Sequence, residues 1–588
     1  MTQPKLPNWL ENKYSVLWDK FKGTTFRMEN AEKILQRGDV DKVQGVAVVL
    51  SELRKAGWLA VVADPKDARK SIYHLKSKDD IIKSIFSTET LSRSDIEGIL
   101  KKAADLIRTR VDYKFILVLL FYKRICDKWE LEYEKAFNQA VKDGFSKEEA
   151  AKEAKNSAYH DFIIPEDYLW ENIRKDVTKL PEKFSQALRI LADKNQELKD
   201  VLDNMDFIQF TTNRENAEIL RQLVELFSEK KLHFVSADIL GDAYEWVLRY
   251  FAPDKAKEGE VYTPREVIKL LVEILEPRPG QSVYDPASAS NGMLIVSYDY
   301  IKDLKGKAEA DKLFLYGQEA NHKTLAFGRM NMYIHDIRNV NLAYGDTLLY
   351  PKFKEGEDVQ KFDSVIANPP WNQDGYDENV LKKGEFWKKR FSYGFVPKQS
   401  GDWAWIQHMI SSSKEKVGIV IDNGCLFRGG KEKNIRMKII EGDANLQGDL
   451  IEAVILLPEK LFYNTSAPGA VLIFNKKKKH KGEILFINAS SEYEQHPDVR
   501  KLNWLNIKNI AKISDTYKKW KEEKGFSRII KIDEIRKNDY NLNVTLYVYP
   551  EEEVEDIDFM KEWEELKKIE KEEVEIDKKI EGFLKEIK

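Results

Sequence analysis

The pattern of apolar and polar positions changes in kind along the chain, and each change predicts a different part of the fold. From about residue 90 to 255, apolar residues recur at steps of three and four, which is the spacing of amphipathic helices. After Gly259, short apolar runs alternate with helix-sized segments. Such alternation predicts an α/β fold with a doubly wound, mostly parallel seven-stranded sheet. The seven runs are residues 281–285, 313–319, 340–346, 362–367, 417–421, 452–458 and 470–475.

The first 80 residues carry a pattern of their own. A helix is expected at 43–56, followed by strands at 58–62 and 71–75 with a polar turn at 64–70 between them. This order is typical of a winged helix whose wing is the turn. A helix and a hairpin that serve only for packing would give the same pattern.

The last segment, residues 551–588, is charged and has an apolar stripe at steps of three, four or seven residues. Such a stripe indicates a long amphipathic helix that packs on a partner or back on its own chain. The stripe consists of Phe559, Trp563, Leu566, Ile569, Ile576, Ile580, Phe583 and Ile587. The predicted parts are a winged-helix-like module (1–80), a helical N-terminal domain (90–255), the sheet domain (256–550) and a C-terminal helix for subunit assembly (551–588).

Composition sets bounds on function. With 588 residues, the chain is too long for one ordinary domain, and its formal charge of -3 means that a polyanion would need a local basic face. The basic stretches 381–390 and 475–482 either contact phosphates or are simply solvated. Cys126 and Cys425 lie far apart without a Cys/His cluster, so neither a disulfide framework nor a metal site is expected. No signal core or spanning run of about 20 apolar residues occurs, which favours a cytoplasmic protein without a membrane partner.

Four successive predicted strands end in residues able to bind a ligand. Asp285, Glu319, Asp346 and Asn368 stand at or just after these ends, where ligands of doubly wound folds bind. A carboxylate in the position of Glu319 would accept the two hydroxyls of a ribose, and Asp346 could accept from an adenine amino group. Each residue alone would be typical of a helix cap or a solvated turn, but four in sequence favour one ligand site.

The fourth strand runs into the sequence Asn368-Pro369-Pro370-Trp371. The two proline rings fix φ and push the preceding residues toward extended geometry, so the backbone is stiff. The side-chain oxygen of Asn368 and the carbonyl of Pro369 can then face one external amino group, which has two hydrogens to donate. Trp371 adds a π face on which a planar base could stack. The alternative is a proline-stiffened surface turn.

This sequence, "NPPW", resembles the [DNS]PP[YFW] signature of amino methyltransferases, which act on exocyclic nitrogens with S-adenosyl-L-methionine. "VYDPASASNGML" resembles the D-P-x-x-G-x-G turn that cradles the methionine part of the cofactor in these enzymes. Ala289 and Asn291 stand where glycines are expected, and alanine is unfavourable at positive φ, so a weakened cofactor site is one alternative.

"EGEVYTPREV" resembles the segment that closes over the methionine end in one class of N6-adenine methyltransferases. There too, the cofactor motifs precede the catalytic one. Thr263 and Glu266 also predict a capping box with Pro264 at the first helical position.

With "GQEANHKTLAFGRMNMYIHDI", "LFYNTSAPGAVLIFNK" and "NDYNLNVTLYV", residues 90–588 resemble the modification (M) subunit of type I restriction-modification systems. The resemblance implies an S-adenosylmethionine-dependent methyltransferase that modifies adenine N6 in double-stranded DNA and so protects host DNA from cleavage. It also implies assembly with a specificity (S) subunit, two M per S, and with a restriction (R) subunit.

The implied mechanism is extrusion of the adenine from the duplex, stacking on Trp371, and acceptance of both amino hydrogens by Asn368 and Pro369. Localising the nitrogen lone pair in this way prepares it for methyl transfer, without a metal or a covalent nucleophile. The motif order and Asn368 favour adenine N6, although the residues also fit cytosine N4. The implied catalytic residues are Asn368, Pro369, Pro370 and Trp371, and the implied cofactor-binding residues are Glu260, Val261, Tyr262, Thr263, Pro264, Arg265, Asp285, Ser290, Asn291, Gly292, Glu319 and Asp346.

Three alternatives stay open. A methyltransferase for glutamine in proteins would also use an Asn-Pro-Pro-aromatic sequence. A non-catalytic scaffold would follow from a degenerate cofactor turn, and a free-standing DNA-binding regulator from the winged-helix pattern.

Overall fold

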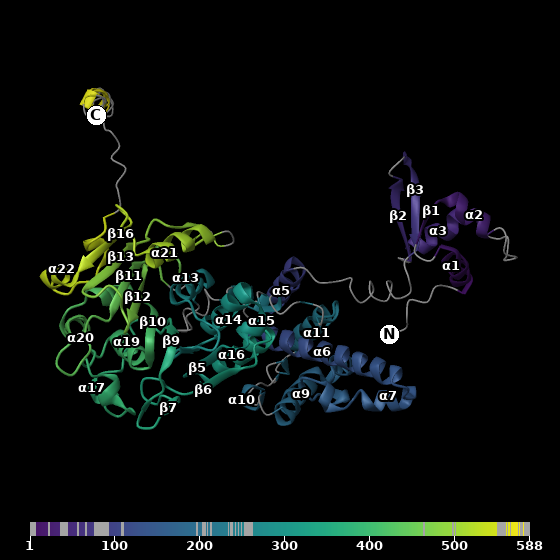
Figure 1. Ribbon diagram of the computed structural model, residues 1–588, viewed down its shortest axis with the longest axis horizontal. Helices are drawn as coiled ribbons and strands as arrows, with labels where there is room; N and C mark the ends of the chain where they lie inside the picture. Colours follow the sequence, from purple (N-terminus) through teal and green to yellow (C-terminus); the bar gives the residue numbers. More distant parts are fainter. Residues whose placement is uncertain are drawn as a thin grey trace, which may run out of the picture. The chain divides into compact units, whose positions relative to one another are not determined.

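The chain divides into two compact units (Figure 1). The first is Met1–Ile96 with Lys231–Ser236, and the second comprises Glu97–Lys230 and Ala237–Lys588. The structure, a computed structural model, describes residues 8–21, 24–35, 45–55, 58–64, 67–75, 93–107, 111–195, 263–462, 465–496 and 501–549 continuously, with shorter pieces between 198 and 251, at 499 and between 560 and 580.

In the part of the first unit that the structure describes, helices α1, α2 and α3 pack with a small antiparallel sheet of strand order β1-β3-β2. Its core includes Tyr14 and Trp58, whose rings meet edge to face at 4.7 Å between centroids. The turn between the last two strands is shorter than the predicted 64–70, because β2 continues through Asp64 and β3 begins at Asp67. The elements are α1 (Asn8–Phe21), β1 (Thr25–Phe26), α2 (Met28–Leu35), α3 (Val46–Lys55), β2 (Leu59–Asp64) and β3 (Asp67–Leu75).

Helices dominate the described residues from 93 to 251, as the apolar spacing predicts. The 29-residue α6 supplies a continuous buried face, on which Tyr122 packs against Trp170 and Phe184. The helices are α5 (Arg93–Ile107), α6 (Lys114–Lys142), α7 (Lys147–Glu153), α8 (Trp170–Arg174), α9 (Leu180–Lys194), α10 (Lys199–Leu202) and α11 (Arg214–Ser228).

A mixed, mostly parallel sheet forms the centre of the second unit. Its order is β16-β13-β11-β12-β10-β9-β4-β5-β6, with β12 and β16 antiparallel to their neighbours. All seven predicted strands are present, and β13 and β16 bring the total to nine, so the predicted strand number is wrong by two. The strands are β4 (Ser282–Asp285), β5 (Phe314–Glu319), β6 (Val340–Tyr344), β9 (Phe362–Ala367), β10 (Ser413–Asp422), β11 (Ile451–Leu456), β12 (Gly469–Asn475), β13 (Glu483–Asn488) and β16 (Ser527–Lys531), with small pairs β7 (Lys354–Glu355) with β8 (Asp358–Val359) and β14 (Glu494–Gln495) with β15 (Asn503–Trp504).

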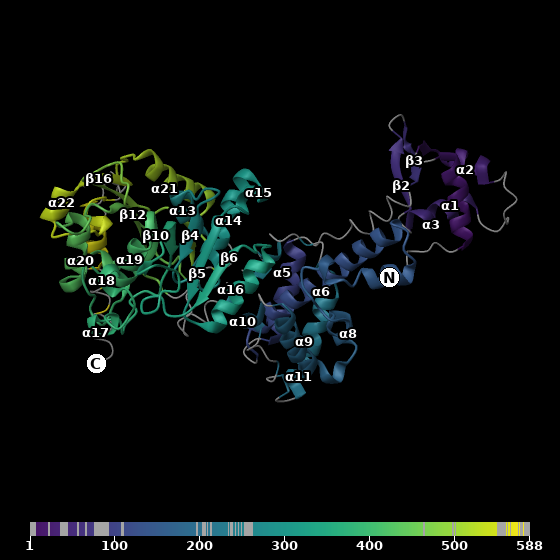
Figure 2. The same ribbon diagram turned by 60° about the horizontal axis from the view of Figure 1, so that its bottom comes forward.

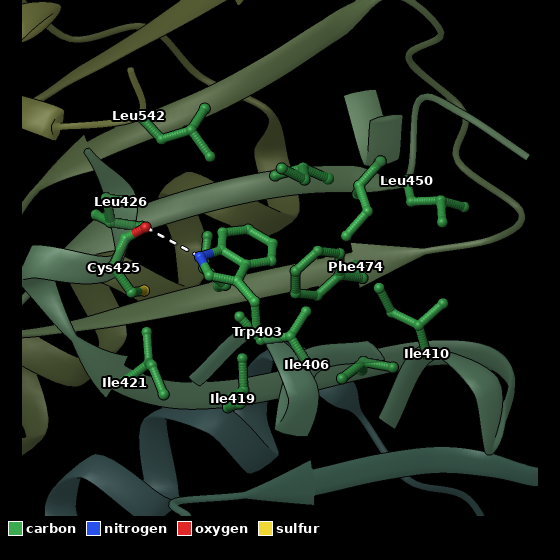
Figure 3. Close-up of a cluster of buried hydrophobic side chains, with 14 of the residues drawn as sticks. Trp403, Ile406, Ile410, Ile419, Ile421, Cys425, Leu426, Leu450, Phe474 and Leu542 are labelled. Carbon is green, nitrogen blue, oxygen red and sulfur yellow. Dashed lines mark hydrogen bonds between the residues drawn. The ribbon is translucent and has the colours of Figure 1, made fainter. Parts of the chain in front are cut away.

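Helices cover both faces of this sheet, and the strands are therefore apolar on both sides (Figure 2). Successive residues alternate between the two cores: Ile419 and Ile421 belong to the core around Trp403, whereas Val420 belongs to the core around Leu271. Figure 3 shows the first of these cores. The helices are α13 (Arg265–Leu275), α14 (Gly292–Lys305), α15 (Lys307–Ala310), α16 (His322–Ile334), α17 (Glu378–Leu381), α18 (Trp387–Arg390), α19 (Asp402–Ser411), α20 (Gly430–Glu441), α21 (Ile507–Lys519) and α22 (Ile532–Lys537).

In the C-terminal segment, the described residues are helical and exposed. They include five members of the predicted apolar stripe, among them Ile569 and Ile576, whereas Phe559, Phe583 and Ile587 lie outside the described residues. Over the described part of the chain, no helix is both long and apolar enough to cross a membrane.

Candidate active site

The sheet brings the four predicted strand ends to one edge. Strands β9, β4, β5 and β6 are adjacent and parallel, so Asn368, Asp285, Glu319 and Asp346 follow neighbouring carboxyl ends. A pocket lies at this edge. Of the predicted site residues, those that line it are Thr263, Arg265, Asp285, Ser290, Gly292 and Asn368.

The turn after β4 adopts the backbone that a glycine-rich turn would have. Ala289 and Asn291, which stand where glycines were expected, have φ of 43° and 65°. The turn also packs closely against α16, and a glycine on that helix leaves the room for it. A Cβ on Gly328 would lie only 2.8 Å from the Ala289 carbonyl oxygen. The Asn291 side chain is fully buried beneath the turn and does not line the pocket. The left-handed geometry is therefore kept in a turn without the glycines.

Replacing Ala289 by glycine should stabilise the folded chain. An alanine at positive φ destabilises the folded chain by roughly 1–2 kcal/mol, which glycine would relieve. The greater conformational freedom of glycine stabilises the unfolded chain by about 0.4–1 kcal/mol and offsets part of this gain. We expect the free energy of unfolding to rise by about 0.5–1 kcal/mol in chemical denaturation. Ala287→Gly is the matched control in the same turn, and it should lower that free energy. Equal destabilisation by both changes would contradict the strain at Ala289.

Asp285 is the most strongly perturbed carboxyl of the pocket. It is 2% exposed and accepts a hydrogen bond from the backbone N–H of Ala287 at 3.0 Å. Burial is the main reason that the pKa of Asp285 is raised to about 8. The Ala287 N–H opposes this rise, and the nearby Glu319 carboxylate adds to it. A positively charged group that enters the pocket would therefore favour the ionised form of Asp285 and pair with it.

Glu319 and Asp346 flank the pocket without lining it. The Glu319 carboxylate accepts from the backbone N–H of Ala289 at 3.0 Å and from that of Asn321 at 2.7 Å, so it holds the turn after β4. Asp346 accepts from the Tyr376 hydroxyl at 2.9 Å. Both carboxylates thus order loops at the edge of the pocket.

The side chain of Asn368 has a defined orientation. Its Nδ2 donates to the Thr263 hydroxyl at 2.8 Å, and its Oδ1 accepts from the indole N–H of Trp371 at 2.8 Å. The sequence predicts that this oxygen faces an external donor, but the indole N–H already takes one of its two lone pairs. The Trp371 ring packs edge to face on Phe462, with 4.7 Å between centroids.

The predicted capping box at the start of α13 is wrong. The helix begins at Arg265 after Pro264 at the cap position, without a side-chain cap bond, because the Thr263 hydroxyl binds Asn368 instead. Arg265 forms an ion pair with Asp299 at 3.2 Å and also lines the pocket. The other predicted residues of this segment, Glu260, Val261 and Tyr262, lie outside the described residues.

Sequence reasoning missed several residues around the pocket. Ser288, Ile268 and Met293 line it, and Phe462 supports Trp371. In the sequence, Ile268 and Met293 look like ordinary apolar core residues of helices, so nothing marks them as part of a site. Phe462 did carry a usable signal, since it follows the carboxyl end of β11, which is parallel to β9 and ends at the same edge of the sheet.

One basic stretch lies away from the pocket. Because β12 is antiparallel to β10, Gly469 pairs with Asp422 at the pocket edge, while Asn475 pairs with Lys416 at the opposite edge. The lysines that follow are engaged there: Lys476 donates to the Ser413 carbonyl at 2.6 Å, and Lys478 forms a largely buried ion pair with Asp449 at 2.6 Å. Residues 475–482 are thus at the wrong edge to hold a substrate over the pocket.

A doubly wound sheet with a pocket at the carboxyl ends of β4 and β9, bordered by an Asn-Pro-Pro-Trp turn, defines the S-adenosylmethionine-dependent methyltransferase fold. Comparison with known proteins narrows this class. The family model for N-6 DNA methylase matches residues 235–556, and that for the HsdM N-terminal domain matches residues 96–227.

Full-length relatives agree with these family matches. The type I restriction enzyme MjaVII methylase subunit of Methanocaldococcus jannaschii is 44% identical over 99% of this chain and 98% of its own. The MjaVIII methylase subunit of the same organism is 43% identical over 98% of this chain and 97% of its own. The crystal structure of a type I restriction-modification methyltransferase subunit from Streptococcus thermophilus is 25% identical, with a TM-score of 0.66, and covers 78% of this chain and all of that one.

The chain therefore belongs to the N-6 DNA methylase family, among the methylase subunits of type I restriction enzymes. It is a DNA methyltransferase specific for adenine N6.

Proposed function

We propose that this chain methylates adenine N6 in double-stranded DNA with S-adenosyl-L-methionine, as the modification subunit of a type I restriction-modification complex that protects host DNA from cleavage. One observation carries the proposal: Asn368 and Asp285 line the same pocket, and Asn368 is hydrogen-bonded to Thr263 on its rim. The predicted catalytic turn and the predicted cofactor turn therefore share one pocket.

The pocket suits the methionine end of the cofactor. The buried Asp285 carboxyl can pair with an ammonium group, and the N-terminus of α14 at Gly292 presents backbone N–H groups of the kind that bind a carboxylate. Ser288 adds a buried hydroxyl that has no hydrogen-bond partner among the described residues. S-adenosyl-L-methionine supplies an activated methyl group on a sulfonium.

The other predicted cofactor residues have roles that follow from their places. Glu319 at the end of β5 would accept the ribose hydroxyls, and Asp346 after β6 would accept from the cofactor adenine. Thr263, Pro264 and Arg265 border the methionine end, together with the preceding residues 260–262. Ser290, Asn291 and Gly292 shape the turn, Asn291 through its backbone.

At the catalytic turn, the Asn368 oxygen and the Pro369 carbonyl accept the two amino hydrogens of an extruded adenine. This localises the lone pair of the amino nitrogen toward the methyl donor, so that the protein contributes orientation. The indole N–H of Trp371 fixes the direction of the Asn368 oxygen, which keeps its second lone pair for the substrate. Pro370 holds the backbone stiff between these groups.

We further propose that the parts of the chain divide the work. Residues 1–80 form a winged-helix-like module, 90–255 a helical domain, 256–550 the catalytic domain and 551–588 an assembly helix. The exposed apolar stripe of this helix supports packing on a specificity subunit, with two modification subunits per specificity subunit and a restriction subunit joining them.

A methylation assay tests the proposed substrate. Duplex genomic DNA and a glutamine-containing peptide are offered with S-adenosyl-L-methionine, with and without the specificity subunit. We expect N6-methyladenine in the DNA, with more of it at defined sites when the specificity subunit is present. Methylation of the peptide alone would favour a glutamine methyltransferase, and no methylation with no cofactor binding in calorimetry would favour a scaffold.

The same assay with chains shortened at either end tests the assembly helix and the regulator alternative. A chain ending at Tyr549 should bind the cofactor normally but lose the stimulation by the specificity subunit. A chain without residues 1–80 should still methylate DNA. Loss of all DNA binding in that second chain, with no methylation by the full chain, would favour a DNA-binding regulator.

A further inference from the structure

A cluster of charged side chains lies directly beside the catalytic turn, at the carboxyl end of β10. Its centre is Arg428, whose Nη1 donates to Asp402 at 2.9 Å and to Glu432 at 3.3 Å. Its Nη2 donates to Asp422 and to the side-chain oxygen of Asn372. The carboxylates of Asp402 and Glu432 are almost completely buried, at 0% and 2% side-chain exposure.

Asn372 connects this cluster to the catalytic turn. It directly follows Trp371 and has a φ of 53°. Its backbone N–H donates to Asp402 at 2.8 Å, while its side chain binds Arg428. The residue that sets the exit direction of the turn is therefore fixed from two sides by one ion pair.

The loop that carries Arg428 is itself held in place. Arg436, 1% exposed, donates to the Arg428 carbonyl at 2.7 Å, to the Cys425 carbonyl at 3.0 Å and to the Tyr540 carbonyl at 3.1 Å. The indole N–H of Trp403 donates to the same Cys425 carbonyl at 3.1 Å (Figure 3). These hydrogen bonds fix the backbone of the loop after β10 and so the position from which the Arg428 guanidinium extends.

Stability alone is a poor reason for such a cluster. Three carboxylates around one guanidinium are costly to desolvate, and a packed apolar group of similar volume often stabilises as well or better. The charged cluster can instead fix the orientation of the side chains around it, because its planar guanidinium binds Asn372 and Asp402 at the same time.

We propose that Arg428 is a positioning residue for methyl transfer, acting through Asp402 and Asn372 to set the direction of Trp371 and, through the indole N–H, of the Asn368 oxygen. The inference rests on the proposed function, because it assigns the cluster to the same catalytic turn. Arg428 does not need to touch the adenine or the cofactor for this role.

Two substitutions of Asn372 test the proposal with little risk to the fold. Asn372→Gly tolerates the positive φ and keeps the N–H bond to Asp402, but it removes the acceptor for Arg428. We expect kcat for DNA methylation to fall by about 10²-fold, the cost of a small misplacement at a reacting centre, with unchanged calorimetric affinity for S-adenosyl-L-methionine. Asn372→Asp keeps the acceptor and tolerates the same backbone, so its kcat should stay near that of the wild type.

Arg428→Lys keeps the charge but loses the planar fork, so it should lower kcat in the same way. Arg536→Lys is the control, because Arg536 forms exposed ion pairs with Glu441 and Asp533 and should leave kcat unchanged. A 2-aminopurine at the target position reports base extrusion, and its fluorescence gain should be reduced in Asn372→Gly and retained in Asn372→Asp.

Each outcome of these assays either supports or overturns the positioning role of Arg428. Wild-type kcat in Asn372→Gly would overturn the positioning role while leaving the proposed function intact. Equal loss of activity and of cofactor affinity in Asn372→Gly and Asn372→Asp would make the cluster merely structural. If the wild type itself does not methylate DNA in this assay, the proposed function fails, and the inference fails with it. Misfolding of Arg428→Lys would leave the decision to the two Asn372 variants.

Discussion

Replacing Asn368 by alanine should lower kcat for adenine methylation by at least about 10²-fold, the loss seen when one preorganised polar contact is removed from an active site. Alanine lacks the oxygen that accepts an amino hydrogen, and the indole of Trp371 loses the acceptor that orients it. The affinity for S-adenosyl-L-methionine should be nearly unchanged, because the buried Asp285 carboxyl is not altered. Counting N6-methyladenine by sequencing, with the specificity subunit present, gives the rate, and calorimetry gives the affinity.

Asn368→Asp is the matched variant, because it keeps an acceptor oxygen at the same place and should retain more activity than alanine. Thr263→Val separates orientation from acceptance. It removes only the hydroxyl that accepts from Asn368 Nδ2, so it should cost less than the loss of the oxygen itself. Wild-type methylation by Asn368→Ala would remove the central claim about this turn.

The general layout of the site followed from the sequence because parallel strands end at one edge of a sheet. Once β4, β5, β6 and β9 were recognised as apolar runs, the residues after them had to lie near one another. The two missed strands, β13 and β16, flank the far side of the sheet. β13 is a short apolar run, residues 484–487, that follows the basic stretch 475–482 with no helix between it and β12, so it departs from the strand-helix alternation. β16 has only two apolar residues, Ile529 and Ile530.

Side-chain partners distant in the sequence could not be predicted in this way. Thr263 and Asn368 are hydrogen-bonded although 105 positions separate them, and the local pattern around Thr263 suggested a helix cap instead. Arg428 and Asn372 are likewise hydrogen-bonded although 56 positions separate them, and no periodicity in the sequence predicts this contact. Such pairs depend on how loops from different strands meet, which short-range patterns do not encode.

The turn after β4 shows a second limit. The missing glycines suggested a weakened site, yet Ala289 and Asn291 both adopt positive φ, and Gly328 on α16 leaves the room that the turn needs. A motif read residue by residue does not reveal compensation by a glycine on another element. The strain at Ala289 is local, and its cost falls on folding stability.

Binding of S-adenosyl-L-methionine should release a proton and strengthen as the pH rises toward 8. The pKa of Asp285 is raised to about 8 by burial, so below that pH the carboxyl is protonated in the free protein. Pairing with the cofactor ammonium requires the ionised form, and the affinity should therefore rise by up to about tenfold per pH unit between pH 6 and 8. Above pH 8 the ammonium itself loses its proton, since an α-amino group titrates near about 7.7–8.0, and the affinity should fall again.

Asp285→Asn isolates the contribution of the carboxyl. The amide can still accept from the Ala287 N–H, but it carries no charge, so the affinity near pH 8 should drop by about 10- to 10²-fold, the value of a charged hydrogen bond. The rising limb should disappear while the falling limb of the ammonium stays. Calorimetry in two buffers of different ionisation enthalpy counts the released protons directly. If the wild type binds equally well at pH 6.5 and 7.5 without proton release, the buried carboxyl does not face the ammonium, and the cofactor would have to be held by the backbone of the turn alone.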